Sequence, residues 1–189
     1  MKKDRKNIIL ESLAGMLEER NLSKITTAAL AKKSNITEAA LYRHFPSKRS
    51  IYAELFSFCD NAIFSKCNEL KKSKLSAKEK VKNAFIFFMI FIEKNKGFAR
   101  LLSREALSSD EQNVSDNVNQ FFERFELILR QMLKEDASNL STQPGLSAQL
   151  IVTSLEGNIG RYIRSKFKDS PSTYIENVWK LLAISIFKN

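Results

Sequence analysis

Residues 35–48 read NITEAALYRHFPSK, and this stretch contains the signals that decide the fold. Thr37 is a preferred residue for capping the start of a helix, and Pro46 cannot continue one, so a short helix is predicted between them. Another short helix is predicted just before it, through AALAKKS at residues 28–34, with Thr26 or Thr27 as its cap. Two short helices joined by a tight turn form a helix-turn-helix, whose second helix enters the DNA major groove.

Helical spacing predicts which side chains of this pair face DNA. Apolar residues are predicted to pack the pair against a first helix, which ends near Arg20: Leu30, Ile36, Leu41 and Phe45. Ala39, Tyr42 and Arg43 are predicted to face outward. A small Ala lets the helix backbone approach base edges, while the polar groups of Tyr, His and Lys suit phosphates. Asn35 is expected at the turn in a left-handed conformation, which Asn tolerates well.

The composition predicts an all-α protein. The chain has 189 residues, 43% of them hydrophobic, with only five Gly and three Pro to make turns. We expect about nine helices, with no repeats and no linker long enough to separate independent domains. Ser76 and Glu79 form a capping box before a central fifth helix, and Ser170 with Pro171 is predicted to start the ninth.

The net charge of +10 is concentrated near the start of the chain. Residues 1–50 hold eleven Lys and Arg against five Asp and Glu, while the remaining residues hold twenty against sixteen. A concentrated basic region is typical of a surface for nucleic acid or anionic membrane, although it can also be a solvated helix face. The helix-turn-helix pattern favours DNA.

The sequence gives no sign of a signal peptide, a membrane span or a disulfide. The start of the chain lacks the apolar core and cleavage site of a signal peptide, and the most apolar run, residues 84–92, is too short to span a membrane. We therefore expect a cytoplasmic protein. Cys59 and Cys67 lie eight residues apart on one expected helix, about 12 Å along its axis, so they are predicted to be unbridged core residues.

An enzyme is the main competing class, and the residues do not favour it. The chain has a single His, already placed in the second short helix, and no Gly-rich phosphate loop or clustered metal ligands. We expect no catalytic residue, no metal and no cofactor.

The segment ITTAALAKKSNITEAALYRHFPSK at residues 25–48 resembles the DNA-binding head of the TetR family, with Asn35 where that family usually has Gly. The resemblance implies a three-helix head at residues 1–48 and a helical dimerisation body at residues 49–189. It also implies that the following residues contact DNA, with Arg43 reading a base or a phosphate: Thr26, Thr27, Thr37, Ala39, Ala40, Tyr42, Arg43, His44 and Lys48.

Within that family, EAALYRHFPSK at 38–48 and NQFFERFELILRQML at 119–133 resemble the members that act in nucleoid occlusion. This implies a nucleoid-associated protein that binds palindromic DNA and, while bound, binds the tubulin-like division protein FtsZ and blocks ring assembly over the chromosome. We expect the acidic, partly apolar C-terminal tail of FtsZ to dock between the fourth and fifth helices, on Phe58, Lys66, Phe87, Lys94 and Asn95. The alternatives are that both lysines are plain surface residues, and that the chain is a ligand-responsive TetR-type repressor.

The last two helices are predicted to form a two-fold dimer interface. Apolar and small residues recur there at helical spacing: Leu155, Gly157, Ile159, Gly160, Ile163, Trp179, Leu182 and Ile186. Leu150 lies on the same predicted stripe. The alternative is that these side chains form the core of the chain itself.

Overall fold

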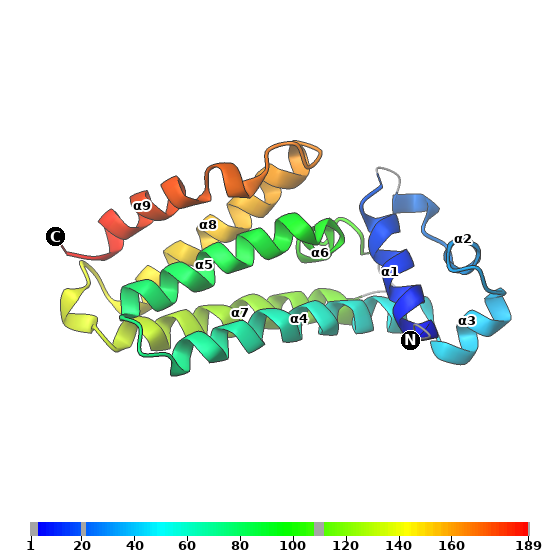
Figure 1. The fold of residues 1–189 in the computed structure, drawn as a ribbon, viewed down its shortest axis with the longest axis horizontal. Coiled ribbons are helices and arrows are strands. Elements are labelled where there is room, and N and C mark those ends of the chain that lie inside the picture. The colour runs from blue at the N-terminus through cyan, green and yellow to red at the C-terminus, as the bar shows by residue number, and fades with distance from the viewer. Residues whose placement is uncertain (1–3, 20–21, 108–111, 189) are drawn as a thin grey trace. The chain divides into compact units, whose positions relative to one another are not determined.

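The computed structural model describes residues 4–19, 22–107 and 112–188, and in these ranges the chain is all-α, as predicted (Figure 1). The α-helices are α1 (Arg5–Leu17), α2 (Thr27–Lys33), α3 (Glu38–His44), α4 (Lys48–Lys72), α5 (Ala77–Lys94), α6 (Lys96–Leu102), α7 (Gln112–Lys134), α8 (Pro144–Arg164) and α9 (Ile175–Ile186). In the same described ranges, three short 3-10 turns accompany them: η1 (Leu22–Lys24), η3 (Ala137–Asn139) and η4 (Pro171–Thr173). The predicted end of the first helix near Arg20 lies outside the described residues.

Local capping signals set most of these boundaries. The Ser47 hydroxyl accepts the N–H of Ser50 at 3.1 Å at the start of α4, and the N–H of Ser47 donates to the Ser50 hydroxyl at 3.2 Å. The predicted capping box is confirmed at α5, where Ser76 accepts from the Glu79 N–H at 3.3 Å and Glu79 accepts from the Ser76 N–H at 2.9 Å. The Ser76 hydroxyl also donates to Glu79 Oε2 at 2.7 Å, and this bond, followed by the bond from the Ser76 N–H, holds the pKa of the Glu79 carboxyl below its usual range.

The predicted start of the ninth helix is wrong. Ser170 and Pro171 open the single turn η4, and α9 begins only at Ile175. The cause is a tertiary contact, since the N–H and the hydroxyl of Ser172 both donate to the Glu93 carboxylate, at 2.7 and 2.9 Å. These bonds tie the turn to the end of α5.

The chain divides into two compact units. Unit 1 contains Met1–Asp60 and Asn95–Val118, and unit 2 contains Asn61–Lys94 and Asn119–Asn189. The domain boundary predicted after residue 48 stays a prediction.

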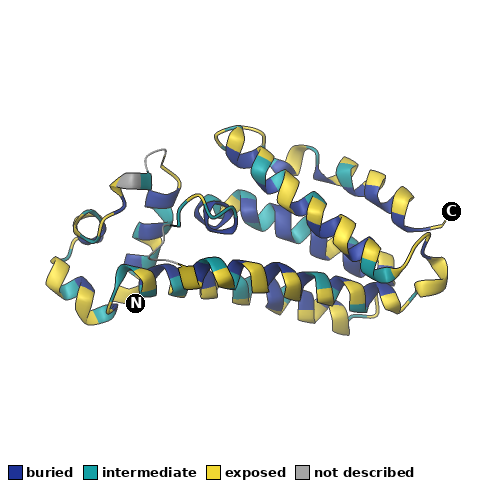
Figure 2. Cartoon of the chain, turned by 180° about the vertical axis from the view of Figure 1, so that it is seen from behind, coloured by how far each residue is buried: buried dark blue, intermediate teal, exposed yellow. Residues whose placement is uncertain are grey.

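Unit 1 is a helical core built on α1. Leu13, Leu17, Leu30 and Leu41 are fully buried there, and Figure 2 colours the ribbon by the burial of each residue. Helix α6 packs directly on α1 at Gly97, where an added Cβ would lie 2.9 Å from the carbonyl oxygen of Ala14. The close approach of the two backbones therefore requires Gly at this position.

Unit 2 is held by an aromatic core. Phe88 stacks against both Phe121 and Phe125, with ring centroids 5.7 and 5.2 Å away, and Phe64 meets the same two rings edge-on. Offset and edge-to-face pairs of this kind add to the stabilisation that burial gives. Helix α5, from which Phe88 comes, packs on both α8 and α9 and is central, as predicted.

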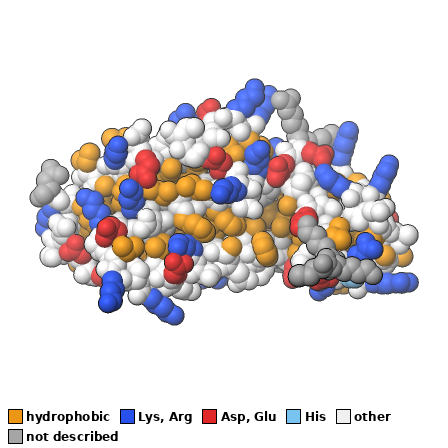
Figure 3. Space-filling view, viewed as in Figure 1, with side chains coloured by type: hydrophobic (Ala, Val, Ile, Leu, Met, Phe, Trp, Pro, Cys, Tyr) orange, Lys and Arg blue, Asp and Glu red, His pale blue; other side chains and the backbone are white. Residues whose placement is uncertain are grey.

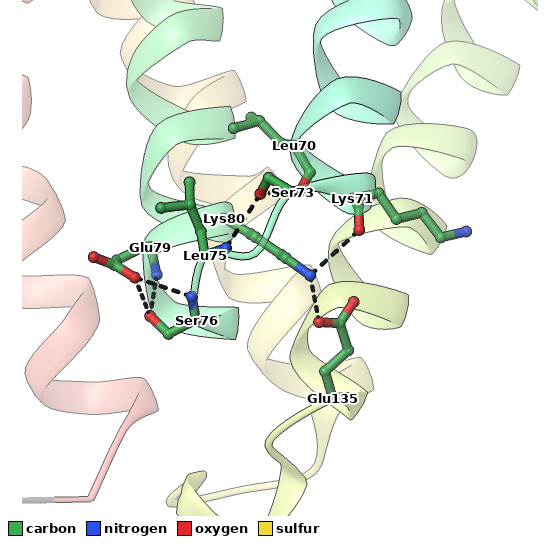
Figure 4. Close-up of polar contacts among 8 residues, drawn as sticks. All are labelled: Leu70, Lys71, Ser73, Leu75, Ser76, Glu79, Lys80 and Glu135. Atoms are coloured by element: carbon green, nitrogen blue, oxygen red, sulfur yellow. Dashed lines mark hydrogen bonds and ion pairs between the residues drawn. The ribbon is translucent and has the colours of Figure 1, made fainter.

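One buried charge lies at the edge of this core. Lys80 on α5 is 5% exposed, and its ammonium donates to Glu135 Oε2 at 2.6 Å and to the carbonyl oxygen of Lys71 at 3.3 Å (Figure 4). The carbonyl belongs to the last turn of α4, and Glu135 follows the end of α7. Lys80 therefore links three helices.

Cys59 and Cys67 are free and buried, which confirms that they are unbridged core residues. Burial raises the pKa of both thiols to about 12. For Cys59 the nearby Asp60 carboxylate contributes to this rise, whereas for Cys67 the Arg124 charge opposes the effect of burial. The apolar run at residues 84–92 lies within α5, and no helix of the described residues is long and apolar enough to cross a membrane.

Candidate nucleic-acid interface

The turn between α2 and α3 has the geometry of a helix-turn-helix. Asn35 adopts a φ of 53°, the left-handed conformation predicted for it. Its N–H donates to the carbonyl oxygen of Lys32 at 3.1 Å, and the next N–H, of Ile36, donates to that of Ala31 at 3.0 Å. These bonds satisfy the last carbonyl groups of α2 and turn the chain into α3.

The two faces of α3 are sorted as predicted. Leu41 and Phe45 are buried, while Ala39, Tyr42 and Arg43 are exposed. Leu30 of α2 is buried as well, and Ile36 in the turn is half-buried. The outward face of α3 thus presents one small side chain, one phenol and one guanidinium.

Thr26 and Thr37 cap the two helices. The Thr26 hydroxyl oxygen accepts the N–H of Ala29 at 3.1 Å, and the Thr37 hydroxyl oxygen accepts that of Ala40 at 3.2 Å. Both residues are exposed. A hydroxyl that accepts in a cap still has its own hydrogen to donate, so capping leaves each Thr able to bind a phosphate oxygen.

Thr27 connects α2 to α3 through its side chain. Its hydroxyl donates to Glu38 Oε1, at the first residue of α3, and accepts from the Tyr42 hydroxyl at 3.5 Å. Glu38 and Tyr42 lie one turn apart on α3, so both reach the same hydroxyl. The polar face of α3 is thereby tied to the start of α2.

The remaining predicted DNA contacts surround this face. Ala40 and His44 are half-buried. Lys48 begins α4, and its ammonium lies 5.2 Å from the centre of the Tyr52 ring. Lys33, at the end of α2, pairs with Glu19 at 2.8 Å. The structure brings the predicted threonines, Tyr42 and Arg43 to α2 and α3 as expected, and their contact with DNA stays a prediction.

Six of the predicted dimer residues are buried within the chain, where they pack into its own core: Leu155, Ile159, Ile163, Trp179, Leu182 and Ile186. Their role in a dimer stays a prediction. Of the predicted set, only Gly157 is exposed and Gly160 half-buried. The large apolar side chains that α8 and α9 expose are Leu146, Leu150, Leu181 and Ile184.

The residues predicted to bind a partner differ in their exposure to solvent. Phe58 is 66% exposed, and Lys94 is exposed at the end of α5. Lys66 pairs with Glu69 at 2.7 Å, whereas Phe87 is half-buried beside Phe91, 6.0 Å between ring centroids. Asn95, half-buried, occupies the capping position of α6 without a side-chain cap bond. Their joint role stays a prediction.

Glu38 is a polar residue of this face that was not among the DNA contacts predicted from the sequence. A local signal for it exists, since Glu38 is the only acid between Glu19 and Glu54. Its contact with Thr27, eleven residues away, is visible only in the fold. Within the described residues, no group of three or more His, Cys, Asp or Glu side chains could hold a metal ion.

Family models match both parts of the chain. Residues 9–55 match the model described as bacterial regulatory proteins, tetR family, and residues 76–186 match the model SlmA-like_C, described as tetracyclin repressor-like, C-terminal domain.

Curated relatives extend the similarity over nearly the full length. The chain is 36% identical to the nucleoid occlusion factor SlmA of Vibrio campbellii, covering 98% of this chain and 97% of that one. It is 35% identical to the protein of the same name from Vibrio cholerae, with 97% and 96% covered, and 35% identical to that of Cronobacter sakazakii, with 98% and 96% covered.

Solved structures share the fold at lower identity. The regulator FadR of Bacillus subtilis, solved with stearoyl-CoA, superposes with a TM-score of 0.79 at 18% identity, over 95% of this chain and 98% of that one. NalD, the secondary repressor of the MexAB-OprM efflux pump in Pseudomonas aeruginosa, also gives 0.79, at 14% identity over 98% and 96%.

Proposed function

The chain belongs to the SlmA nucleoid occlusion factors of the TetR family, and we propose that it acts as one, as a homodimer that binds palindromic chromosomal DNA and blocks cell division there. The observation that carries the DNA-binding part is the outward face of α3, joined to α2 through a left-handed Asn35. The proposed location is the cytoplasm, on the nucleoid.

The phosphate contacts of this face are tested by salt dependence. Tyr42→Ala and Lys48→Ala should weaken binding to every duplex, since both side chains are proposed to contact phosphates rather than bases. Lys48→Ala should also reduce the slope of log affinity against log salt by about 2, since the dimer carries two copies of Lys48 and each contact contributes about 1. Lys74→Ala, an exposed lysine of unit 2, serves as the control. Affinity that does not change with salt, or with either substitution, contradicts the assignment.

We propose that dimerisation uses the apolar side chains exposed on α8 and α9. Leu146 and Leu150 lie one turn apart on α8, and Leu181 and Ile184 lie one turn apart on α9. The two helices pack on each other within unit 2, and the proposal is that both pairs form one apolar surface. A patch of this kind is usually covered by a partner, and a two-fold copy of the same surface would cover it with four helices.

The finer part of the proposal is the partner, the C-terminal tail of the division protein FtsZ. The support comes from the family and from α5, whose apolar side chains are half-buried at positions that share a face: Ile86, Phe87, Ile90 and Phe91. Hydrophobic side chains reach the surface among Lys and Arg on the face that Figure 3 draws. Such apolar side chains, together with the half-buried Lys66 and the exposed Lys94, would suit an acidic, partly apolar peptide.

This partner is tested by titrating the DNA-bound dimer with a peptide of the FtsZ C-terminal tail in a calorimeter. Lys66→Glu with Lys94→Glu should abolish peptide binding and leave palindrome binding nearly intact, because a lysine contacts a carboxylate as a point charge whose sign is then reversed. Lys72→Glu with Lys74→Glu changes the charge equally on exposed lysines outside the predicted site. If both double variants bind the peptide like the wild type, the lysines have no role in docking.

The ligand-responsive repressor has the same kind of DNA-binding head, so binding to a palindrome does not separate it from a nucleoid occlusion factor. The two functions differ in how their sites are distributed over the chromosome and in whether the DNA-bound dimer binds the FtsZ tail.

A further inference from the structure

Glu38 is an acid on a basic surface. The chain between Glu19 and Glu54 contains seven Lys and Arg and only this one acid, which is exposed at the first residue of α3. A carboxylate facing DNA repels every phosphate near it and lowers affinity for duplexes of any sequence. This loss of affinity is offset only at a DNA sequence where the carboxylate accepts a hydrogen bond from a base.

The fold holds this carboxylate in a defined direction. The Thr27 hydroxyl donates to Glu38 Oε1, and the Tyr42 hydroxyl in turn donates to Thr27 Oγ1 at 3.5 Å. These two hydrogen bonds join α2 to α3. They restrain the Glu38 side chain before DNA binds, so less conformational entropy is lost on binding. With Oε1 bound to Thr27, the carboxylate keeps a second oxygen, Oε2, that can accept from a base.

The chemistry of the major groove selects the base. An ionised carboxylate only accepts hydrogen bonds, and the base edges that donate there are the N4 amino group of cytosine and the N6 amino group of adenine. Adenine also presents N7, an acceptor beside its amino group, which repels a second acceptor. Guanine presents acceptors alone, and thymine an acceptor and a methyl group.

We propose that Glu38 is a specificity-determining residue that accepts a hydrogen bond from the N4 amino group of one cytosine in each half of the palindrome, with Thr27 as its positioning residue. The inference rests on the proposed DNA-binding function. A purely structural Glu38 would stabilise the start of α3 and its link to α2, and would change affinity for all duplexes alike.

The test is selection of bound duplexes from a randomised palindromic library. Wild-type protein should require cytosine at one position in each half-site. Glu38→Gln should relax that position by roughly tenfold or shift it toward adenine, which Gln can bind through N6 and N7, and leave the other positions unchanged. Glu54→Gln makes the same chemical change on α4 and should leave every position unchanged.

Thr27 gives a second measurement on the same half-site position. Thr27→Val removes the hydroxyl that orients the carboxylate and should relax the cytosine requirement there. Thr27→Ser keeps a hydroxyl and should keep the cytosine requirement. If Thr27→Val lowers affinity equally for all sequences, Thr27 does not position Glu38.

Wild-type protein alone also tests the contact, independently of whether a variant folds. Replacing each selected cytosine in turn by the pyrimidine that lacks the 4-amino group should cost about tenfold in affinity at one position per half-site. Unchanged affinity at every cytosine overturns the inference. Two results separate it from the function on which it rests: if no palindrome is enriched, the DNA-binding function fails as well, and if palindromes are enriched identically by wild type and Glu38→Gln, only the role of Glu38 fails.

Discussion

The buried ion pair of unit 2 predicts that removing its exposed member costs more than removing its buried one. The Lys80 side chain is 6% exposed and that of Glu135 41% exposed, with 2.6 Å between Nζ and Oε2 (Figure 4). Glu135→Ala leaves the ammonium buried with only the Lys71 carbonyl as acceptor. Lys80→Met keeps most of the aliphatic stem and leaves a carboxylate that water already reaches.

The magnitudes follow from this asymmetry. Breaking a buried pair so that its charge stays buried costs roughly 3 kcal/mol, the lower part of the usual range, because Glu135 is partly solvated. Lys80→Met should cost about 1–2 kcal/mol, close to the loss of one hydrogen bond to a charged group. In a protein of this length, a loss of roughly 3 kcal/mol lowers the melting temperature by about 6–12 °C.

The assay is urea unfolding followed by circular dichroism, with the free energy of unfolding measured for both single variants and the double variant. The double variant should be more stable than Glu135→Ala alone, since it no longer contains a buried charge. Glu176→Ala, which breaks an exposed pair with Lys82 at 3.0 Å, should cost no more than about 0.5 kcal/mol. If Lys80→Met costs more than Glu135→Ala, this explanation of the pair is wrong.

Three further predictions concern the dimer, the thiols and the contact of α6 with α1. Leu181→Asp with Ile184→Asp should give a folded monomer in sedimentation, because both side chains are about 70% exposed, and a dimer that persists would contradict the proposed surface. Cys59 and Cys67 should not react with an aromatic disulfide reagent at pH 8 until the chain is unfolded. Since their folded pKa of about 12 lies above the ordinary value of 9.0, stability should also fall as pH rises above 9.0, and thiols that react in the folded protein would contradict their burial. Gly97→Ala should lower the melting temperature, since its Cβ would lie 2.9 Å from a backbone oxygen of α1, and an unchanged melting temperature would show that the two helices move apart without cost.

The sequence predicted the head well because its signals are local. Thr26, Thr37 and Ser47 each cap a helix through an N–H three residues away, a distance that a sequence shows directly. Asn35 was predictable for the same reason, since the left-handed conformation depends on the residue itself and on the turn around it. Elements that depend on neighbours in sequence are therefore the ones that sequence reasoning places correctly.

The proposed dimer surface does not follow from local sequence signals. Helix α8 has apolar residues on two sides, with Leu155 and Ile159 buried and Leu146 and Leu150 exposed. Periodicity identifies a stripe but not what covers it. The predicted start of the ninth helix is wrong for a related reason, because the distant Glu93 carboxylate on α5 binds the turn that the local cap signal assigned to α9.

Genome-wide mapping of the DNA bound by this protein, in the bacterium that encodes it, tests the central proposal most directly. A nucleoid occlusion factor should occupy many palindromic sites dispersed around the chromosome, most of them away from promoters. Occupancy confined to one or a few palindromes beside promoters would contradict this account and would favour a ligand-responsive repressor.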